Sequence, residues 1–213
     1  MATKISNCGS NENGKTTGGK AGDQTGKEYR VISWYSRPWK CVLRYPDPKV
    51  GEEIARISEA AAKNDNIGYC QTHRRTYHDA LKAANWNPAA IKTPVEADCS
   101  ASTLANIIAA GHKCGIAALK QVNPDGYTGN MRAALKKAGF TVLTDSKYLT
   151  SSDYLLPGDI LLNDNAHTAV NLTAGTKAKA AAVTAPAAAP TTATVEKTIW
   201  NFLIGKGLNA YAA

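Results

Sequence analysis

Apolar runs long enough to cross a membrane are missing from this 213-residue sequence. A spanning helix needs about 20 consecutive apolar residues, and no stretch approaches that length. The opening segment MATKISNCGSNENGKTTGGK also lacks the apolar core of a secretory signal peptide. We therefore expect neither a signal peptide nor insertion into a membrane.

Cysteine is scarce and irregularly spaced, with residues at positions 8, 41, 70, 99 and 114 and no C-x-x-C pair. An odd count without regular spacing is not typical of a disulfide framework or of a zinc site built from cysteine pairs. Cys70 and His73 fit one face of a helix, but His78 would lie about 140° round the helix from His73. The sequence therefore predicts no metal site and no cofactor.

Clusters that alternate basic and aromatic residues, as nucleic-acid platforms do, are also missing. The chain nevertheless carries 25 Lys and Arg against 17 Asp and Glu, a formal net charge of +8. A basic balance favours polyanionic partners. The densest basic stretch, THRRTYH at 72–78, would be spread around a helix. We expect no nucleic-acid partner, and a nucleic-acid-binding protein remains the alternative that this charge leaves open.

The pattern of apolar residues predicts an α+β fold, with a helical half packed on a small antiparallel sheet. Residues 1–27 are rich in Gly, Asn, Lys and Thr, which is typical of a loop, and residues 86–97 form a loop punctuated by proline. Gly111 is placed to end the helix that begins after Asp98. The expected strands are 28–35, 39–45, 141–143, 159–164 and 167–173, and the expected helices are 46–65, 68–85, 98–115 and 127–140.

The composition changes at residue 174. Ten of the twenty residues 174–193 are Ala, and the others are mainly Thr, Pro and Lys, which predicts a linker over 174–194. Residues 195–213 then begin an amphipathic helical pattern that is too short to build its own core. We expect one main domain over 1–173 and the start of a second, incomplete domain over 195–213.

Cys99 lies where the sequence predicts the N-terminus of an apolar helix. Helix N-termini stabilise a thiolate through free N–H groups and the helix dipole, and the same N–H groups can hold an oxyanion. A nucleophilic thiol also needs a base. His167 is the best candidate because it opens the last expected strand, and a large separation in sequence is no obstacle.

The segments EADCSAS and LLPGDILLNDNAHTAVNL resemble the NlpC-type and CHAP branch of the papain-like cysteine peptidases. The shared motifs are D-C-S at residues 98–100, P-G-D at 157–159 and a histidine at 167, in the family's order. Residues 18–44 are similar to an N-terminal segment of phage and prophage lysins of this kind. The segment TIWNFLIGKGLNAYAA further resembles the start of a tail-lysozyme-like domain.

This resemblance implies a papain-like fold and a peptidoglycan hydrolase that cleaves an amide bond in the stem peptide or cross-bridge, as an endopeptidase or an amidase. Cys99 would be the nucleophile and His167 the base, with Asp98 and Ser100 orienting the site. Such an enzyme is made in the bacterial cytoplasm and reaches the wall through a holin or as part of a virion. The alternative is a non-catalytic wall-binding module with a degenerate papain-like fold.

The residue that orients His167 stays open at the level of the sequence. In the family it lies on the strand after the histidine strand, but here the expected linker begins at that point. Asn171 is one candidate, although four residues along a strand separate it from His167 by about 13 Å. The other possibility is an N-terminal strand that fills the missing position and brings in one of three polar residues, which are Asp23, Gln24 and Glu28.

Overall fold

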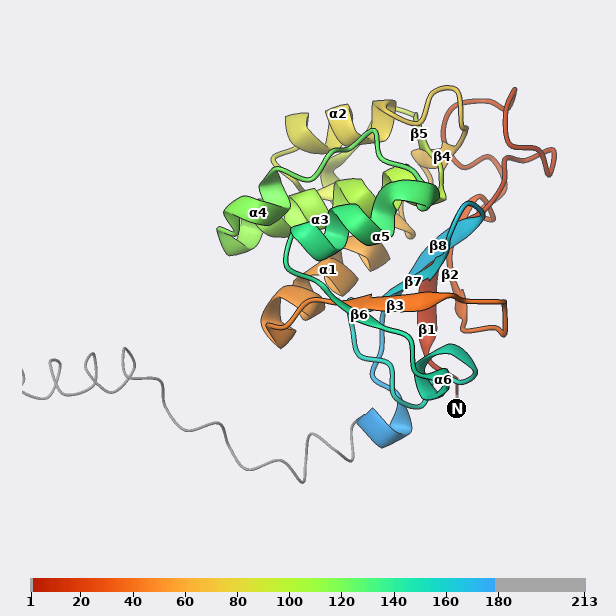
Figure 1. The fold of residues 1–213 in the computed structure, drawn as a ribbon. Helices are drawn as coiled ribbons and strands as arrows, with labels where there is room; N and C mark the ends of the chain where they lie inside the picture. Colours follow the sequence, from red (N-terminus) through yellow and green to blue (C-terminus); the bar gives the residue numbers. More distant parts are fainter. Residues whose placement is uncertain (1, 179–213) are drawn as a thin grey trace, which may run out of the picture. The chain divides into compact units, whose positions relative to one another are not determined.

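A computed structural model of the chain describes residues 2–178 (Figure 1). The predicted second domain at 195–213 and most of the predicted linker therefore lie outside the described residues. Residues 174–178 are described, and they pack back on the domain, because the Gly175 amide donates to the Leu155 carbonyl at 2.8 Å. No helix in the described part is both long and apolar enough to cross a membrane.

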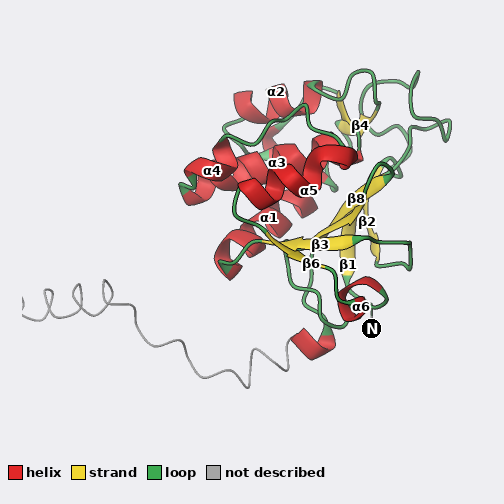
Figure 2. Cartoon of the chain, viewed as in Figure 1, coloured by secondary structure: helices red, strands yellow, loops and turns green. Residues whose placement is uncertain are grey.

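The structure is built on a six-stranded sheet in which every neighbouring pair is antiparallel. Most of the helices gather on one side of it (Figure 2). The predicted α+β class is confirmed, as are the five strands expected from the sequence. In spatial order the strands are β2 (Tyr29–Ser33), β1 (Lys4–Cys8), β8 (His167–Asn171), β7 (Ile160–Asn163), β3 (Cys41–Arg44) and β6 (Thr141–Leu143).

Strand β1 corrects the prediction of a loop over residues 1–27. It lies between β2 and β8, so that the first and last strands of the described chain are neighbours (Figure 1). Its sequence KISNC holds one β-branched residue, Ile5, and is followed by a long polar loop, which hides the strand from pattern analysis. The strand is stabilised by pairing with two distant segments, because Ile5 lies opposite both Ile32 and Asn171.

The four expected helices are present, with differences in two of them, and the sequence pattern did not predict three further short helices. The predicted helix 68–85 is shorter, because its first residues form a strand. The helix that begins at Cys99 ends at Gly115, which adopts φ 74°, and not at Gly111. Gly111 instead lets another helix approach, since a Cβ there would lie 2.6 Å from Cβ of Leu119. The helices are α1 (Pro48–Ala61), α2 (Thr76–Ala83), α3 (Cys99–Cys114), α4 (Ala117–Lys120), α5 (Thr128–Lys137), α6 (Ser146–Leu149) and the short 3-10 helix η1 (Pro88–Ala90).

Each face of the sheet has its own hydrophobic cluster. The larger cluster joins the inner faces of α1, α3 and α5 to strand residues such as Leu43 and Val170. The smaller cluster covers the opposite face and includes Ile5, Trp39 and Ala169, with residues of α6 packed on it. Because side chains alternate along a strand, neighbouring residues of β8 belong to different clusters.

A second, two-stranded parallel sheet places the start of α3. It pairs β4 (Ile67–Tyr69) with β5 (Val95–Ala97), two segments that the sequence predicts as helix and loop. Both strands are fully buried and only three residues long, which is too short for a pattern to show. Strand β5 runs through Asp98 directly into α3, so this small sheet fixes the first turn of that helix.

The turn Pro157-Gly158-Asp159 joins β7 to helix α1 by close packing. Gly158 has φ 81°, and a Cβ there would lie 2.2 Å from the carbonyl oxygen of Gly51. Asp159 is almost fully buried and forms a bidentate ion pair with Arg44, at 2.6 and 2.7 Å. The motif is therefore a packing requirement of this fold.

We expect Gly158→Ala to lower the free energy of unfolding by about 2–4 kcal/mol, because it adds backbone strain and a steric overlap. Urea unfolding followed by circular dichroism measures the loss. Gly115→Ala is the matched control, since Gly115 has a similar φ of 74° and an added Cβ there would meet nothing within 4 Å. Equal losses in the two variants would contradict a role for close packing.

Candidate active site

The first turn of α3 is held by the side chain of Asp98. Its Oδ1 accepts hydrogen bonds from the backbone N–H of Ala101 at 2.7 Å and from Oγ of Ser100 at 2.8 Å. A short acidic residue at this position satisfies N–H groups that have no partner within the helix. Cys99 is the first helical residue, and its exposed fraction is 8%.

Arg74 is a site residue that the sequence did not indicate. Its Nε lies 2.8 Å from Oδ2 of Asp98 as an ion pair, and its Nη2 donates to Oγ of Ser100 at 2.9 Å. The same Nη2 donates to the carbonyl of Gly126 at 2.5 Å. The guanidinium thus ties the turn before α2 to the start of α3 and to the segment before α5. Only the tertiary structure reveals this role, since residue 74 has no motif of its own.

A cavity of about 340 Å³ opens at the N-terminus of α3. Its wall combines the turn after β4, the first residues of α3, the start of α5 and the turn between β7 and β8. Cys99 is the one cysteine among its lining residues. These are Gln71, Arg74, Asp98, Cys99, Ser100, Tyr127, Thr128, Asn165 and Ala166.

His167 is oriented by Asn7, a residue of β1. The Nε2 of His167 lies 2.8 Å from Oδ1 of Asn7, which also accepts from the hydroxyl of Tyr35 at 3.3 Å. Because Oδ1 accepts both bonds, Nε2 carries the imidazole proton and Nδ1 keeps its lone pair. The ring of Trp39 stacks on His167 with centroids 6.2 Å apart. His167 is 7% exposed, so this environment fixes both its tautomer and its position.

The residue before His167 connects it to the cavity, although His167 itself is not among the lining residues. Ala166 lines the cavity together with Cys99, and the backbone N–H of Thr168 acts to lower the pKa of the Cys99 thiol. No hydrogen bond joins Cys99 and His167 among residues 2–178. Contacts between a nucleophile and its base are often loose before substrate binds. The structure thus places Cys99 and the neighbour of His167 in one cavity wall, and the catalytic pairing of Cys99 with His167 stays a prediction.

Burial keeps both groups neutral at pH 7. It raises the pKa of the Cys99 thiol to about 11, and the nearby Asp98 carboxylate raises that pKa further. The backbone N–H groups of Thr168 and Ser100 act in the opposite direction and lower it. Burial also lowers the pKa of His167 to about 4, assisted by the positive charge of Arg37. The resting state is therefore a neutral thiol and a neutral imidazole that can accept a proton.

Asn171, the first candidate for orienting His167, does not contact it. Its amide nitrogen donates to the carbonyls of Leu156 and Thr173, at 2.8 and 2.7 Å, at the far end of β8. The physical reason is the strand itself, which separates the two side chains by four residues. The alternative expectation, an N-terminal strand next to the histidine strand, agrees with the position of β1 beside β8. The residue of that strand that bonds to His167 is Asn7, and not Asp23, Gln24 or Glu28.

The polar residues of the 21–28 loop also lie away from the cavity. Asp23 accepts hydrogen bonds from three backbone N–H groups of its own loop and from that of Tyr29, the first residue of β2, at 3.1 Å. Glu28 is fully buried and accepts from the backbone N–H groups of Gln24 and Tyr69. Gln24 is exposed and donates to carbonyls of the same loop. Glu28 therefore braces the loop against β4, whereas Asp23 and Gln24 hold the loop itself, and none of the three lines the cavity with Cys99.

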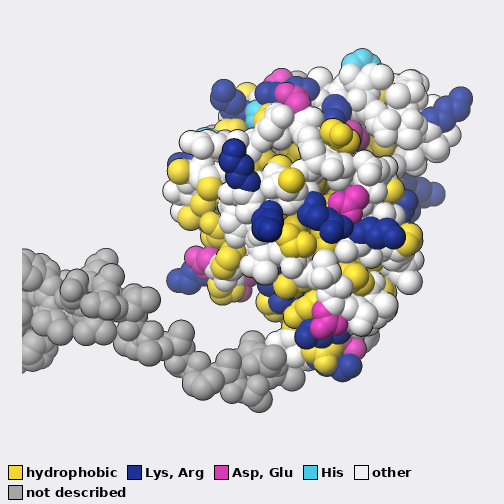
Figure 3. Space-filling model, in the orientation of Figure 1, with side chains coloured by type: hydrophobic (Ala, Val, Ile, Leu, Met, Phe, Trp, Pro, Cys, Tyr) yellow, Lys and Arg dark blue, Asp and Glu magenta, His cyan; other side chains and the backbone are white. Residues whose placement is uncertain are grey.

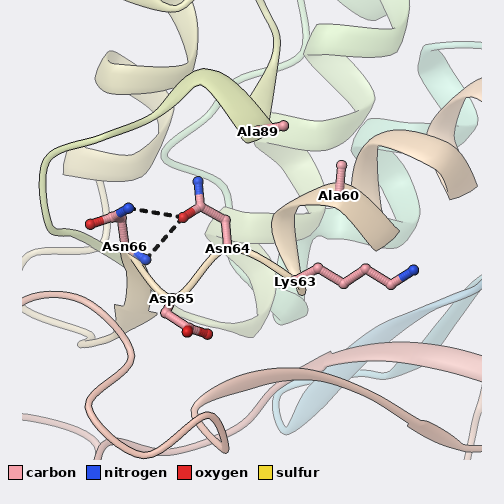
Figure 4. A pocket seen from close by; sticks show the side chains of 6 residues that line it. All are labelled: Ala60, Lys63, Asn64, Asp65, Asn66 and Ala89. Carbon is pink, nitrogen blue, oxygen red and sulfur yellow. Dashed lines mark hydrogen bonds between the residues drawn. The ribbon is translucent and has the colours of Figure 1, made fainter.

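A second cavity, of about 540 Å³, lies at the C-terminal end of α1 (Figure 4). Its lining includes Lys63, Asp65 and two asparagines that bond to each other through Oδ1 of Asn64. The Asn64 amide also donates to the carbonyls of Pro88 and Ile91, so it holds the turn in place. This cavity has no thiol, hydroxyl or imidazole in its wall and is a poor candidate for nucleophilic chemistry.

The remaining cysteines lie in other settings. Cys8 and Cys41 are buried in the core, and Cys114 is exposed at the end of α3. Cys70 differs from these, since its sulfur lies near the side chains of His73 and Glu96. That group is the one cluster within residues 2–178 whose spacing suits a metal ion.

Basic side chains are spread over the face seen in Figure 3, with acidic side chains among them. Among the described residues several basic side chains form ion pairs, including Arg132 with Asp164 and Arg75 with Asp125. This face thus offers mixed charge. The expectation of no nucleic-acid partner stays a prediction.

Comparison with known proteins assigns the domain. A family model described as "endolysin-like domain" matches residues 5–178. The chain belongs to this endolysin-like family. The matched range begins within β1 and covers the other five strands of the main sheet, together with Cys99 and His167. No curated protein and no solved structure matches the chain significantly.

Membership of the endolysin-like family indicates a lytic function directed at the bacterial cell wall, with peptidoglycan as the fitting substrate, and it fits phage lysis. The match does not itself choose the NlpC or CHAP branch or a cysteine mechanism. It also ends before residues 195–213, so the resemblance of that segment to a tail-lysozyme-like domain stays a prediction.

Proposed function

We propose that this endolysin-like domain is a papain-like cysteine hydrolase that cleaves an amide bond of peptidoglycan. The observation that carries the proposal is the Asn7–His167 hydrogen bond beside a cavity that contains Cys99 at a helix N-terminus. A thiol, an imidazole and an amide that orients the imidazole form the working set of a cysteine peptidase.

In the proposed reaction, Nδ1 of His167 takes the thiol proton as the sulfur of Cys99 attacks the substrate carbonyl. The resulting oxyanion is held by the backbone N–H of Cys99, with the Gln71 side chain on the cavity wall as a second donor. His167 then gives its proton to the leaving amine, and a thioester remains on Cys99. Water, deprotonated by His167, hydrolyses the thioester and restores the free thiol.

The neutral resting pair favours general-base catalysis at the moment of attack. A thiol with a raised pKa holds little thiolate at pH 7, so it needs a base that is unprotonated. His167 meets this requirement because its pKa is lowered to about 4. As the proton moves, thiolate and imidazolium form next to each other and stabilise one another.

Chemical analysis of the products released from purified peptidoglycan identifies the type of bond that the domain cleaves. We expect the domain to release fragments with new amino groups and no new reducing sugar ends, because a thiol nucleophile acts on carbonyls. Mass spectrometry of the digest then separates an endopeptidase, which cuts within or between peptides, from an amidase, which frees whole stem peptides.

New reducing ends without new amino groups would contradict the proposed chemistry. Binding to the wall with no release of either product would favour the alternative, a non-catalytic wall-binding module.

A further inference from the structure

Three potential metal ligands come together, and two of them are sequence neighbours of residues that line the active-site cavity. Cys70 directly follows β4, Glu96 is the central residue of β5, and His73 lies in the turn before α2. The sulfur of Cys70 lies 3.6 Å from Nδ1 of His73, which in turn lies 3.0 Å from Oε2 of Glu96. All the potential ligand atoms lie within 4.8 Å of one another.

These separations suit a tetrahedral metal ion. Zn²⁺ bonds of about 2.3 Å to sulfur and about 2.0 Å to nitrogen place those two ligand atoms about 3.6 Å apart. A nitrogen and a carboxylate oxygen on the same ion lie about 3.3 Å apart. The observed sulfur–nitrogen separation agrees, and a shift of about 0.3 Å in the exposed His73 ring brings the nitrogen–oxygen separation into line.

The carboxylate of Glu96 provides an independent reason to expect a cation. Glu96 is 4% exposed, and its Oε1 is buried with no hydrogen-bond partner within residues 2–178. Its ion-pair partner is His73, whose side chain is 63% exposed. A buried carboxylate with an unsatisfied oxygen is costly, and a metal ion compensates for that cost directly.

We propose that Cys70, His73 and Glu96 bind a Zn²⁺ ion, with water at the fourth position. Thiolate, imidazole and carboxylate together suit zinc, whereas Mg²⁺ and Ca²⁺ prefer oxygen ligands alone. Two of the ligands lie on or next to the paired strands β4 and β5, where the Cys70 amide donates to the carbonyl of Ala97 at 2.9 Å. Much of the site is therefore held in place before the metal binds.

Zinc at this position would fix the turn 70–75, which supplies two residues of the active-site cavity. Gln71 is the neighbour of Cys70, and Arg74 is the neighbour of His73. The sequence predicts no metal site here because Glu96 lies more than twenty residues from the other ligands and reaches them only through the pairing of β4 with β5.

Cobalt binding to the metal-stripped full chain tests the site without reference to catalysis. Co²⁺ reports a bound thiolate through a charge-transfer band in the near ultraviolet, and Zn²⁺ is then added to displace it. We expect one ion per chain, loss of the band in Cys70→Ser, and affinity weakened by more than about tenfold in His73→Ala. Glu96→Gln should also weaken binding.

His73→Ala is the decisive variant, because the exposed side chain can be removed without opening the core. Cys114→Ser removes an exposed thiol and should leave the band unchanged. Cys99→Ala should also keep it, which separates this site from the catalytic thiol. A wild-type chain without the band, an unchanged affinity in His73→Ala, or a band that disappears in Cys99→Ala would each overturn the proposal.

Discussion

Replacing Cys99 with alanine is expected to lower the rate of peptidoglycan hydrolysis by about 10⁴-fold or more. The substitution removes the sulfur that forms the covalent intermediate, and the neighbouring hydroxyl of Ser100 is already engaged by Asp98 and Arg74. The side chain is small and sits at the edge of the core, so the fold should be retained. Turbidity loss of wall suspensions and release of soluble amino groups measure the effect.

Cys114→Ser is the matched control for Cys99→Ala. Cys114 ends the helix that Cys99 begins, is exposed, and lies far along α3 from the cavity, so its loss should leave the rate unchanged. Iodoacetamide adds a chemical readout, in which labelling of Cys99 should depend on His167 while labelling of Cys114 should not. Full activity in Cys99→Ala would contradict the proposed cysteine mechanism.

The parts of the candidate site that depend on local sequence are the parts that could be predicted. Asp98 caps a helix because a short acid precedes an apolar run, and the structure shows that cap. Gly158 and Asp159 mark a turn, and His167 opens a strand, again from their nearest neighbours. Local patterns of this kind fix secondary structure and caps, which is why most of the helices and five of the six strands in the main sheet match expectation.

The residues that the sequence missed depend on pairing between distant segments. Asn7 reaches His167 across 160 residues, and it does so only because β1 pairs with β8. A short strand of mixed composition gives no local signal for that pairing. Arg74 likewise belongs to the site through contacts with Asp98 and Gly126. Neither residue belongs to a recognisable sequence motif, and each reaches the site only through its position in the fold.

Replacing Asn7 with alanine is expected to lower kcat by about 10²-fold, with a smaller effect on KM. Without the Oδ1 acceptor, the imidazole loses both its fixed tautomer and its orientation, and a misplaced base costs about this much. Asn171→Ala is the matched control: it removes a second buried asparagine of the same sheet, yet Asn171 bonds to carbonyls at the other end of β8. Its kcat should stay near that of the wild type, whatever it costs in stability.

Asn7→Asp separates positioning from a purely structural role. In the wild type, the lowered pKa of His167, about 4, keeps the base neutral and active in mildly acidic solution. A carboxylate at position 7 stabilises the imidazolium, so the pKa of His167 rises and the acid limb of kcat/KM moves up by about one to three pH units. Activity at pH 5 should then fall much more than activity at pH 8. If the acid limb stays in place in Asn7→Asp, or if Asn171→Ala loses kcat as strongly as Asn7→Ala, then Asn7 does not hold the catalytic base.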